Sequence, residues 1–337
     1  MKRWQFWSGV FISAFFLWLV LRDIEYSLLW QKTRQANYWL ILPGVFVYFI
    51  ALWVRTWRWH YLLRPVKAVP THVMFPIVTM GYAGNNIFPA RAGELLRAVI
   101  LKRKQDITIS ASLATIIVER VYDGVVMLAF IFLNLGELSR LTDDIKVMGE
   151  MTVQDVALWG SLAFFGALLL FLAAAMFPVQ SEKVSAWLIE KLVPGRYRPR
   201  LLAVTQRFLG GLESLRSPLE ALMVFLTSVV IWLLETVKYW FVMHAFGFSV
   251  SFFALMLMNG VVNLATTIPS APGYLGTFDL PGIAVLEAYS VPKETAASYT
   301  FVLHFALWFP VTALGLFYMW REGIKWSGKL EDISTSD

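Results

Sequence analysis

Long apolar runs alternate along this chain with short segments rich in Lys, Arg, Trp and Tyr. A helix that crosses a bilayer needs about 20 predominantly apolar residues, and six of the runs approach or exceed that length. They cover residues 4–21, 38–60, 109–135, 156–177, 219–242 and 296–320. The pattern predicts an all-α polytopic membrane protein with about six full transmembrane helices.

Two further apolar runs, residues 71–88 and 252–267, end in segments that interrupt a helix. The first break reads Asn-Asn-Ile-Phe-Pro-Ala-Arg-Ala-Gly, and the second, residues 268–279, reads Ile-Pro-Ser-Ala-Pro-Gly-Tyr-Leu-Gly-Thr-Phe-Asp. If residues 71–88 crossed fully, the basic residues that follow would face the outside, against the positive-inside tendency. We therefore predict re-entrant hairpins over residues 71–104 and 252–290, with their irregular backbone sheltered by protein or a water-filled cavity.

The two hairpins predict an inverted repeat. Pro-x-x-x-Gly occurs at the same place in both breaks, and each half has two spans, a broken hairpin and a final span. Such repeats are common in secondary transporters, whose substrate site lies at paired broken helices. We expect one membrane domain: a first repeat over residues 1–135, an outer loop over 136–155, a second repeat over 156–320 and a cytoplasmic tail over 321–337. The expected hinges are Pro89, Gly93, Pro269, Pro272, Gly273 and Gly276.

The distribution of basic residues predicts the orientation. Most of the 29 Lys and Arg residues fall in segments that the path places in the cytoplasm, together with both termini. Trp53, Arg55, Trp57, Arg58 and Trp59 read as an aromatic and basic girdle at the cytoplasmic interface. Residues 178–218 read as amphipathic helices along the inner leaflet. We expect an integral protein of the prokaryotic plasma (inner) membrane.

Composition narrows the function. The chain is 58% hydrophobic and 15% charged, whereas soluble domains carry about 45–50% apolar and about 25% charged residues. An excess of Lys and Arg in such a chain is a topology signal, so we expect no nucleic-acid partner. Cysteine is absent and the four His are scattered, so we expect no disulfide, metal site or cofactor.

The first break has the chemistry of a phosphate site. A broken helix leaves unpaired amide donors and a partial positive charge at a helix N-terminus. Arg91 and Arg97 add full charges, and an Arg guanidinium binds phosphate oxygens in bidentate fashion. Two alternatives stay open for each polar neighbour. Glu94 has a structural role, in which it caps the helix dipole or pairs with an Arg, or it contacts the substrate. The amides of Asn85 and Asn86 cap freed backbone groups or contact a ligand.

Other polar residues lie inside apolar runs. A charged side chain is costly within a bilayer, as at Glu119, Arg120 and Asp123. These residues mark a functional site, or they form ion pairs that neutralise one another and tie this span to Arg91 or Arg97. The two roles are compatible. The second break contributes three further candidate substrate contacts, Ser270, Tyr274 and Asp279, but no Arg. We interpret Glu235 with Lys238 as a structural or interfacial pair, and His304 as a satisfied core residue rather than a proton relay.

These residues resemble the flippase-like family typified by the transmembrane region of lysylphosphatidylglycerol synthases. The residues that match the first part of its pattern are Asn86, Pro89, Arg91, Gly93, Glu94, Arg97, Glu119, Arg120 and Asp123. In the second part Pro269, Pro272, Gly273 and Gly276 match, while Tyr274 replaces a Gly and Asp279 a Glu. The resemblance spans nearly the whole chain.

The resemblance implies a protein that moves or handles lipid, since these regions are held to move aminoacylated phosphatidylglycerol between leaflets. No soluble aminoacyl-transferase domain follows Trp320, so we expect the protein not to make the lipid itself. Our leading hypothesis is a flippase or transporter for a phosphate-bearing lipid, anionic or aminoacylated. No nucleotide-binding loop is present, which leaves gradient-driven or passive exchange.

Two other classes stay open. One is a membrane-embedded transferase or phosphatase that uses Glu119, Asp123 or Asp279 as a base, for which the carboxylate must reach a substrate proton. The other is a non-transporting protein that presents lipid to a lipid-synthesising partner enzyme. Transfer of lipid by the purified protein alone separates both from a flippase.

Overall fold

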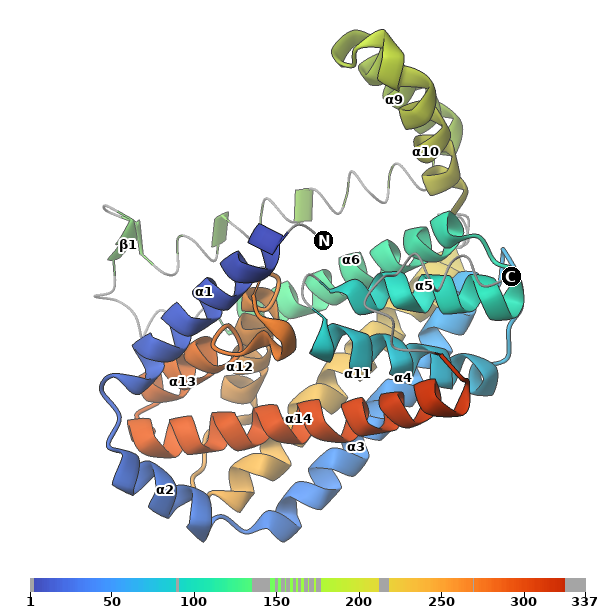
Figure 1. Cartoon of the computed structure of the whole chain (residues 1–337). Coiled ribbons are helices and arrows are strands. Elements are labelled where there is room, and N and C mark those ends of the chain that lie inside the picture. The colour runs from blue at the N-terminus through green and yellow to red at the C-terminus, as the bar shows by residue number, and fades with distance from the viewer. Residues whose placement is uncertain are drawn as a thin grey trace.

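The computed structural model describes residues 3–88, 91–134, 146–148, 151–152, 177–211, 218–268 and 270–324, with isolated residues between 155 and 173. Helices make up almost all of it (Figure 1). The α-helices are α1 (Arg3–Leu21), α2 (Tyr26–Gln35), α3 (Ile41–Leu63), α4 (Thr71–Ile87), α5 (Ala92–Gln105), α6 (Ile109–Leu133), α9 (Pro178–Leu192), α10 (Arg198–Gly211), α11 (Pro218–Ala245), α12 (Phe252–Ala265), α13 (Asp279–Ala288) and α14 (Lys293–Arg321). Short 3-10 helices are η1 (Tyr38–Leu40), η2 (Gly195–Tyr197) and η4 (Pro272–Tyr274), and β1 (Lys146–Met148) pairs antiparallel with β2 (Met151–Thr152).

The helical class is confirmed, and so is the membrane character of the longest helices. Within the part of the chain that the structure describes, three helical segments are long and apolar enough to cross a bilayer: Tyr38–Leu63, Leu219–Ala245 and Lys293–Arg321. Helix α6 has 25 residues, but three charged side chains interrupt its apolar run. Most of the expected span 156–177, Pro89, Pro269 and the tail from residue 325 lie outside the described residues.

Helices α4 and α5 form a tight hairpin around the first break. A Cβ atom on Gly84 would lie 2.8 Å from Cα of Gly93, and one on Gly93 would lie 1.9 Å from the carbonyl oxygen of Gly81. Only glycine permits backbones to approach this closely. Arg91, which precedes α5, has φ 53°, a left-handed conformation that turns the chain back. The hairpin shape is therefore set by residues of the break itself.

The second break separates α12 from α13 and relies on positive φ angles. Gly273 has φ 74° and Gly276 has φ 79°, values that glycine adopts without steric cost. Asp279, the first residue of α13, accepts a hydrogen bond from the backbone N–H of Gly276 at 2.8 Å. A Cβ atom on Gly273 would lie 3.5 Å from the carbonyl oxygen of Asn86 at the end of α4. The two breaks thus face one another.

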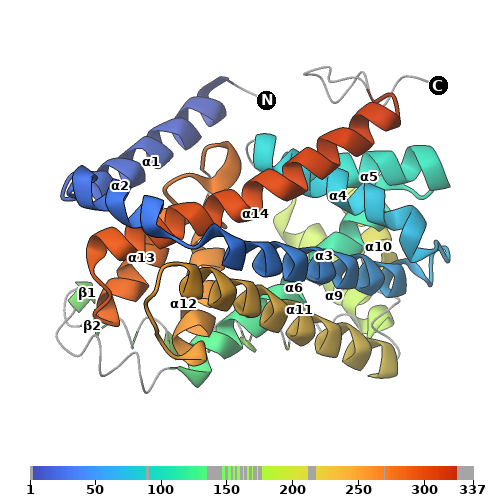
Figure 2. The same ribbon diagram turned by 90° about the horizontal axis from the view of Figure 1, so that it is seen from below.

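Each main helix contact made by the first half of the chain has a counterpart in which the second-half helix takes its place. Helices α3 and α11 pack side by side along their lengths (Figure 2). Helix α4 packs on α14 as α12 packs on α6, and α5 packs on α6 as α13 packs on α14. A glycine sits at each of the first two crossings, Gly315 against Ala83 and Gly260 against Met127. The buried apolar residues likewise form one large cluster centred on α3–α6 and another centred on α11–α14.

The remaining helices lie outside this pattern. Helices α9 and α10 form an antiparallel pair in which Gln206 donates a hydrogen bond to Glu182 at 2.6 Å, and α10 packs on α6. The pair extends away from the other helices at the top of Figure 1. Helix α2, which the hydrophobic pattern does not predict, packs on α14, where Thr33 and Ser298 are hydrogen-bonded at 3.2 Å.

We expect Gly93→Ala to destabilise the protein by about 1–3 kcal/mol, because the added methyl overlaps the backbone of α4. Thermal unfolding of the detergent-purified protein measures the change. Gly195→Ala is the matched control, since nothing lies within 4 Å of a Cβ atom at that position. Equal stability of both variants would contradict the close approach of α4 and α5.

Candidate functional site

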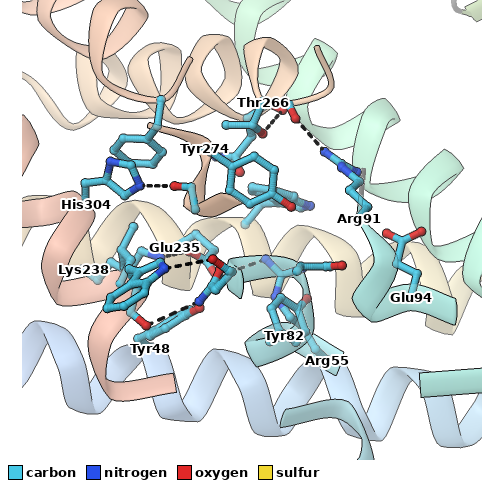
Figure 3. Close-up of a pocket in the computed structure, with 18 of the residues that line it drawn as sticks. Tyr48, Arg55, Tyr82, Arg91, Glu94, Glu235, Lys238, Thr266, Tyr274 and His304 are labelled. Atoms are coloured by element: carbon cyan, nitrogen blue, oxygen red, sulfur yellow. Dashed lines mark hydrogen bonds and ion pairs between the residues drawn. The ribbon is translucent and has the colours of Figure 1, made fainter. Parts of the chain in front are cut away.

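A polar cavity of about 140 Å³ lies between the two breaks. Its wall is built by α3, α4, α5, α6, α11, α12 and α14 together with the residues of both breaks (Figure 3). Of the residues singled out from the sequence as substrate contacts, those on the wall are Asn85, Asn86, Arg91, Glu94, Arg120 and Tyr274. The structure thus brings together residues almost 200 positions apart.

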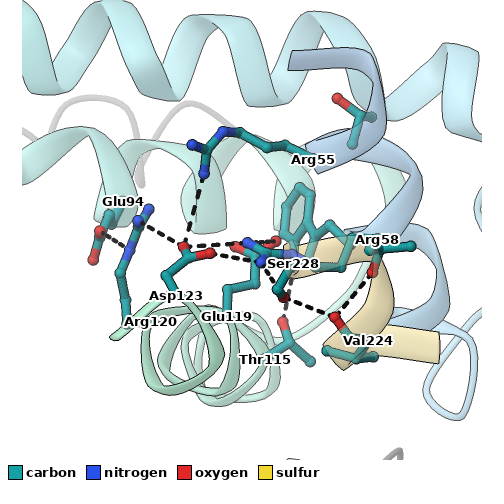
Figure 4. Close-up of polar contacts among 12 residues, drawn as sticks. Arg55, Arg58, Glu94, Thr115, Glu119, Arg120, Asp123, Val224 and Ser228 are labelled. Carbon is teal, nitrogen blue, oxygen red and sulfur yellow. Dashed lines mark hydrogen bonds and ion pairs between the residues drawn. The ribbon is translucent and has the colours of Figure 1, made fainter. Parts of the chain in front are cut away.

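Asp123 is the centre of a buried ion-pair network behind this wall (Figure 4). Only 1% of its surface is exposed. Arg58 donates to its carboxylate at 2.6 Å, and the indole N–H of Trp232 donates to the same oxygen at 2.9 Å. Arg120 lies 3.3 Å and Arg55 3.8 Å from the other oxygen. Asp123 therefore joins α3, α6 and α11.

Three further carboxylates extend the network. Glu119 pairs with Arg97, and Glu235 pairs with Lys238 and with Arg55 at 3.0 Å. Glu94 lies 2.8 Å from Nε of Arg120. The connected cations are Arg55, Arg58, Arg97, Arg120 and Lys238, and the connected carboxylates are Glu94, Glu119, Asp123 and Glu235. Five cations against four carboxylates leave one positive charge in excess.

Arg91 adds a second excess charge. Its guanidinium reaches across the cavity from the first break and meets the carbonyl oxygen of Thr266 at 3.4 Å. Within the described residues no carboxylate lies at ion-pair distance from it. A guanidinium with only one long contact to a neutral carbonyl keeps donors for an anionic ligand. The cavity is consequently cationic.

The interfacial girdle expected on residues 53–59 is wrong for its two arginines and for Trp59, which is fully buried. Arg55 is 6% exposed and Arg58 is 2% exposed, and both pair with carboxylates of α6 and α11. The acidic residues inside the apolar runs of α6 and α11 are the sequence feature that indicates buried cations, because a buried carboxylate needs a cation close by. Similarly, Glu235 and Lys238 do form a pair, but the pair is buried and lines the cavity rather than an interface.

Several candidate contacts lie away from the cavity surface. Arg97, Glu119 and Asp123 are in the network behind the wall. The carbonyl oxygen of Ser270 packs against Gly9 of α1, and Asp279 is fully buried between Gly276 and His304. The cavity residues that the sequence did not single out for a ligand are Tyr48, Arg55, Tyr82, Trp232, Glu235, Lys238, Asn263, Thr266, Gly273, Phe278, His304, Leu307 and Trp308.

An apolar pocket of about 510 Å³ adjoins the polar cavity. Its walls include Leu275 of the second break and Phe305 of α14, which are 48% and 60% exposed and so face the outside of the helix bundle. The residues that line both spaces are Asn86, Gly273, His304 and Trp308. The polar cavity and the apolar pocket therefore form one amphipathic site.

Asn86 and Trp308 hold the boundary between the two spaces. The indole N–H of Trp308 donates to the carbonyl oxygen of Asn86 at 3.2 Å, and the amide of Asn86 donates to Thr312 at 2.8 Å. These bonds tie the end of α4 to α14. The open question about Asn86 is answered in part, since its amide bonds within the protein, whereas the side-chain oxygen of Asn85 is buried without a described partner.

Comparison with known proteins gives one family. Residues 6–315 match the sequence profile of the family described as the lysylphosphatidylglycerol synthase TM region. A UPF0104 membrane protein of Methanothermobacter thermautotrophicus is 24% identical over 317 residues, which are 89% of this chain and 90% of the relative. The UPF0104 membrane protein PH1989 of Pyrococcus horikoshii is 22% identical over 91% of this chain and 93% of its own length.

One relative is named as an enzyme. Glycosyltransferase AglD of Haloferax volcanii is 24% identical over 336 residues, which are 91% of this chain but 53% of the relative. About half of that protein therefore has no counterpart in the matched region. Its activity is a property of that longer protein.

Removing the charge of the Asp123 carboxylate should destabilise the protein. We expect Asp123→Asn to lower the free energy of unfolding by about 3–5 kcal/mol, because it leaves Arg58 buried without full compensation. Asp23→Asn removes an exposed carboxylate and should change stability by less than about 0.5 kcal/mol. Chemical denaturation of both variants in detergent checks this; similar midpoints would contradict a structural role for Asp123.

Proposed function

Since the chain belongs to the lysylphosphatidylglycerol synthase transmembrane-region family, we propose that it is a flippase or transporter that translocates a phosphate-bearing lipid across the bilayer. The lipid is anionic or carries an aminoacyl group on its phosphate-linked headgroup. The observation that carries the proposal is the amphipathic site: a cationic cavity that adjoins an apolar pocket on the outer face of the bundle. A lipid is the ligand class with both parts.

The charge balance favours a phosphate headgroup. Two positive charges remain in excess around the cavity once the described ion pairs are counted, and Arg91 supplies one of them. A phosphodiester carries one negative charge and accepts bidentate hydrogen bonds from a guanidinium. In the proposed complex Arg91 holds the phosphate, and Asn85, Asn86 and Tyr274 contact the headgroup. Arg97, Glu119 and Asp123 fix the wall from behind.

We also propose the membrane arrangement behind this mechanism. The exchange pattern of helix contacts supports an inverted repeat, in which two re-entrant hairpins meet at the cavity between about six transmembrane helices. Both termini then lie in the cytoplasm, the chain in the prokaryotic plasma (inner) membrane, and α9 with α10 at the inner leaflet. Movement of one half relative to the other would open the cavity to alternate sides of the membrane.

The name of the Haloferax volcanii relative favours a second candidate. That protein combines a region like this chain with a further half and is named a glycosyltransferase. This chain would, by analogy, present a lipid to a separate lipid-synthesising enzyme without moving it. The purified protein alone would then bind phosphate-bearing lipid but leave it in its leaflet.

Reconstitution separates the two candidates. Vesicles that contain the purified protein and a fluorescent phosphatidylglycerol, or a fluorescent polyprenyl phosphate, are treated with a quencher that reaches only the outer leaflet. We expect protein-dependent loss of the protected signal for at least one of the probes. Protection equal to that of protein-free vesicles for both probes would sink the flippase hypothesis and leave the presenting role.

Arg91→Ala should lower the rate of lipid transfer by at least about tenfold, because one charge-assisted hydrogen bond to the phosphate is lost. Stability should be little changed, since Arg91 makes one long contact with Thr266. Arg103→Ala, which removes an exposed arginine from α5, the helix that follows Arg91, is the control for the loss of charge alone. Unaltered transfer by the Arg91 variant would remove Arg91 from the site.

Filling the apolar pocket should slow transfer without changing the charge of the site. Leu275→Trp places a larger side chain at the pocket wall, and we expect transfer to be at least about fivefold slower. Binding of the phosphate-containing headgroup should be normal. Leu316→Trp, at a partly exposed position of α14 away from the pocket, is the control. Equal rates for both variants would exclude the pocket from the lipid path.

A further inference from the structure

His304 and Asp279 form a buried pair between the polar cavity and the apolar pocket. Nδ1 of His304 lies 2.9 Å from a carboxylate oxygen of Asp279, and Nε2 lies 2.6 Å from the carbonyl oxygen of Gly273. His304 is 8% exposed, and the ring of Phe278 stacks on it at 4.4 Å. Figure 3 shows His304 at the cavity wall with its hydrogen bond to the second break.

Both partners of the imidazole are acceptors. A carbonyl oxygen has no proton to donate, and an ionised carboxylate accepts only. A neutral imidazole has one N–H donor and one acceptor nitrogen, so it satisfies one of these two contacts but not both. The observed geometry therefore requires one proton more than a neutral His and an ionised Asp supply. That proton belongs to the pair, whether it resides on Nδ1 or on the carboxyl group.

The extra proton holds the second break to α14. The other carboxylate oxygen of Asp279 accepts from the N–H of Gly276, so the pair fixes Gly273, Gly276 and the start of α13 together. Loss of the proton would bring two lone pairs face to face at one contact and leave a net negative charge in a buried setting. The break would then lose one of the bonds that hold it to α14.

We propose that His304 and Asp279 form a proton-binding site whose occupancy sets the conformation of the second break and so links lipid movement to a proton. The link to lipid movement rests on the proposed function. The proton site lies beside Gly273, which lines both the cavity and the apolar pocket. A change in the break therefore alters the boundary that a lipid headgroup must pass.

The charged groups around the pair come from several elements of the cavity wall. Among the described residues, Asp279 is the one carboxylate within ion-pair distance of His304. Glu94 and Glu235, the two carboxylates on the cavity wall, are already paired with cations. The remaining charged or titratable groups on that wall are Tyr48, Arg55, Tyr82, Arg91, Arg120, Lys238 and Tyr274.

The Asp279→Asn variant distinguishes the effect of the extra proton from the effect of the hydrogen bonds. The amide oxygen of Asn can accept from Gly276, its NH₂ group can donate to Nδ1, and Nε2–H can donate to Gly273, so all three contacts persist without an extra proton. A purely structural role for Asp279 predicts that this variant behaves as wild type at every pH. The proton site predicts that it transfers lipid at a rate insensitive to pH.

The transfer experiment uses the full chain in vesicles of phosphatidylethanolamine and phosphatidylglycerol, with a fluorescent phosphatidylglycerol probe and equal pH on both sides. As pH is raised through and above the range of about 5 to 8 in which histidine titrates, the wild-type rate should change by at least about fivefold. The Asp279→Asn rate should stay constant. A wild-type rate independent of pH, or a variant that keeps the wild-type pH profile, would overturn the linkage.

Nitrogen-15 NMR of histidine-labelled protein tests the proton site without lipid transfer. The His304 signals are identified by their absence from His304→Gln. In the wild type they should shift as rising pH removes the shared proton, whereas in Asp279→Asn they should stay at the neutral, Nε2-protonated form. Wild-type signals that do not move with pH would refute the proton site. Absence of lipid transfer at every pH would instead refute the proposed function, and with it the linkage.

Discussion

The rest of the structure depends on the pairing of charges that are buried in an apolar bundle. An isolated ion in such surroundings is strongly unfavourable, so each carboxylate within the runs needs a cation close by. Asp123 of α6 meets this need with Arg58 of α3 and the indole of Trp232 on α11. These contacts fix three helices relative to one another and place the polar cavity at their centre.

The same pairing decides what the cavity can bind. Glu94, Glu119, Asp123 and Glu235 are each held by cations, so the carboxylates of the network offer little to a cationic ligand. The cations outnumber them, and Arg91 stands apart from the network at the first break. The charge of this cavity is consequently complementary to an anion, and the adjoining apolar pocket would hold the hydrocarbon chain of the proposed lipid.

Each helix break is stabilised by the other. Arg91 reaches Thr266 beside the second break, and Gly273 approaches the carbonyl of Asn86 at the end of the first. Helix α14 joins both, through Trp308 to Asn86 and through His304 to Gly273. Backbone groups freed by the breaks thus find partners in protein rather than in lipid, which is the condition for irregular backbone within a membrane domain.

The sequence by itself determined most of the described helices, though not α2, to within a few residues, and it determined the positions of both breaks. Apolar run length, proline and glycine are local properties. It also identified Asn85, Asn86, Arg91, Glu94, Arg120 and Tyr274, all of which line the cavity. Only the tertiary structure decided which charges meet. Arg58 finds Asp123 65 residues away and Arg55 finds Glu235 180 residues away, and a pattern of spacings within one helix carries no information about partners on another. For the same reason a local hydrophobic pattern placed Arg55 and Arg58 at an interface, whereas packing buried them.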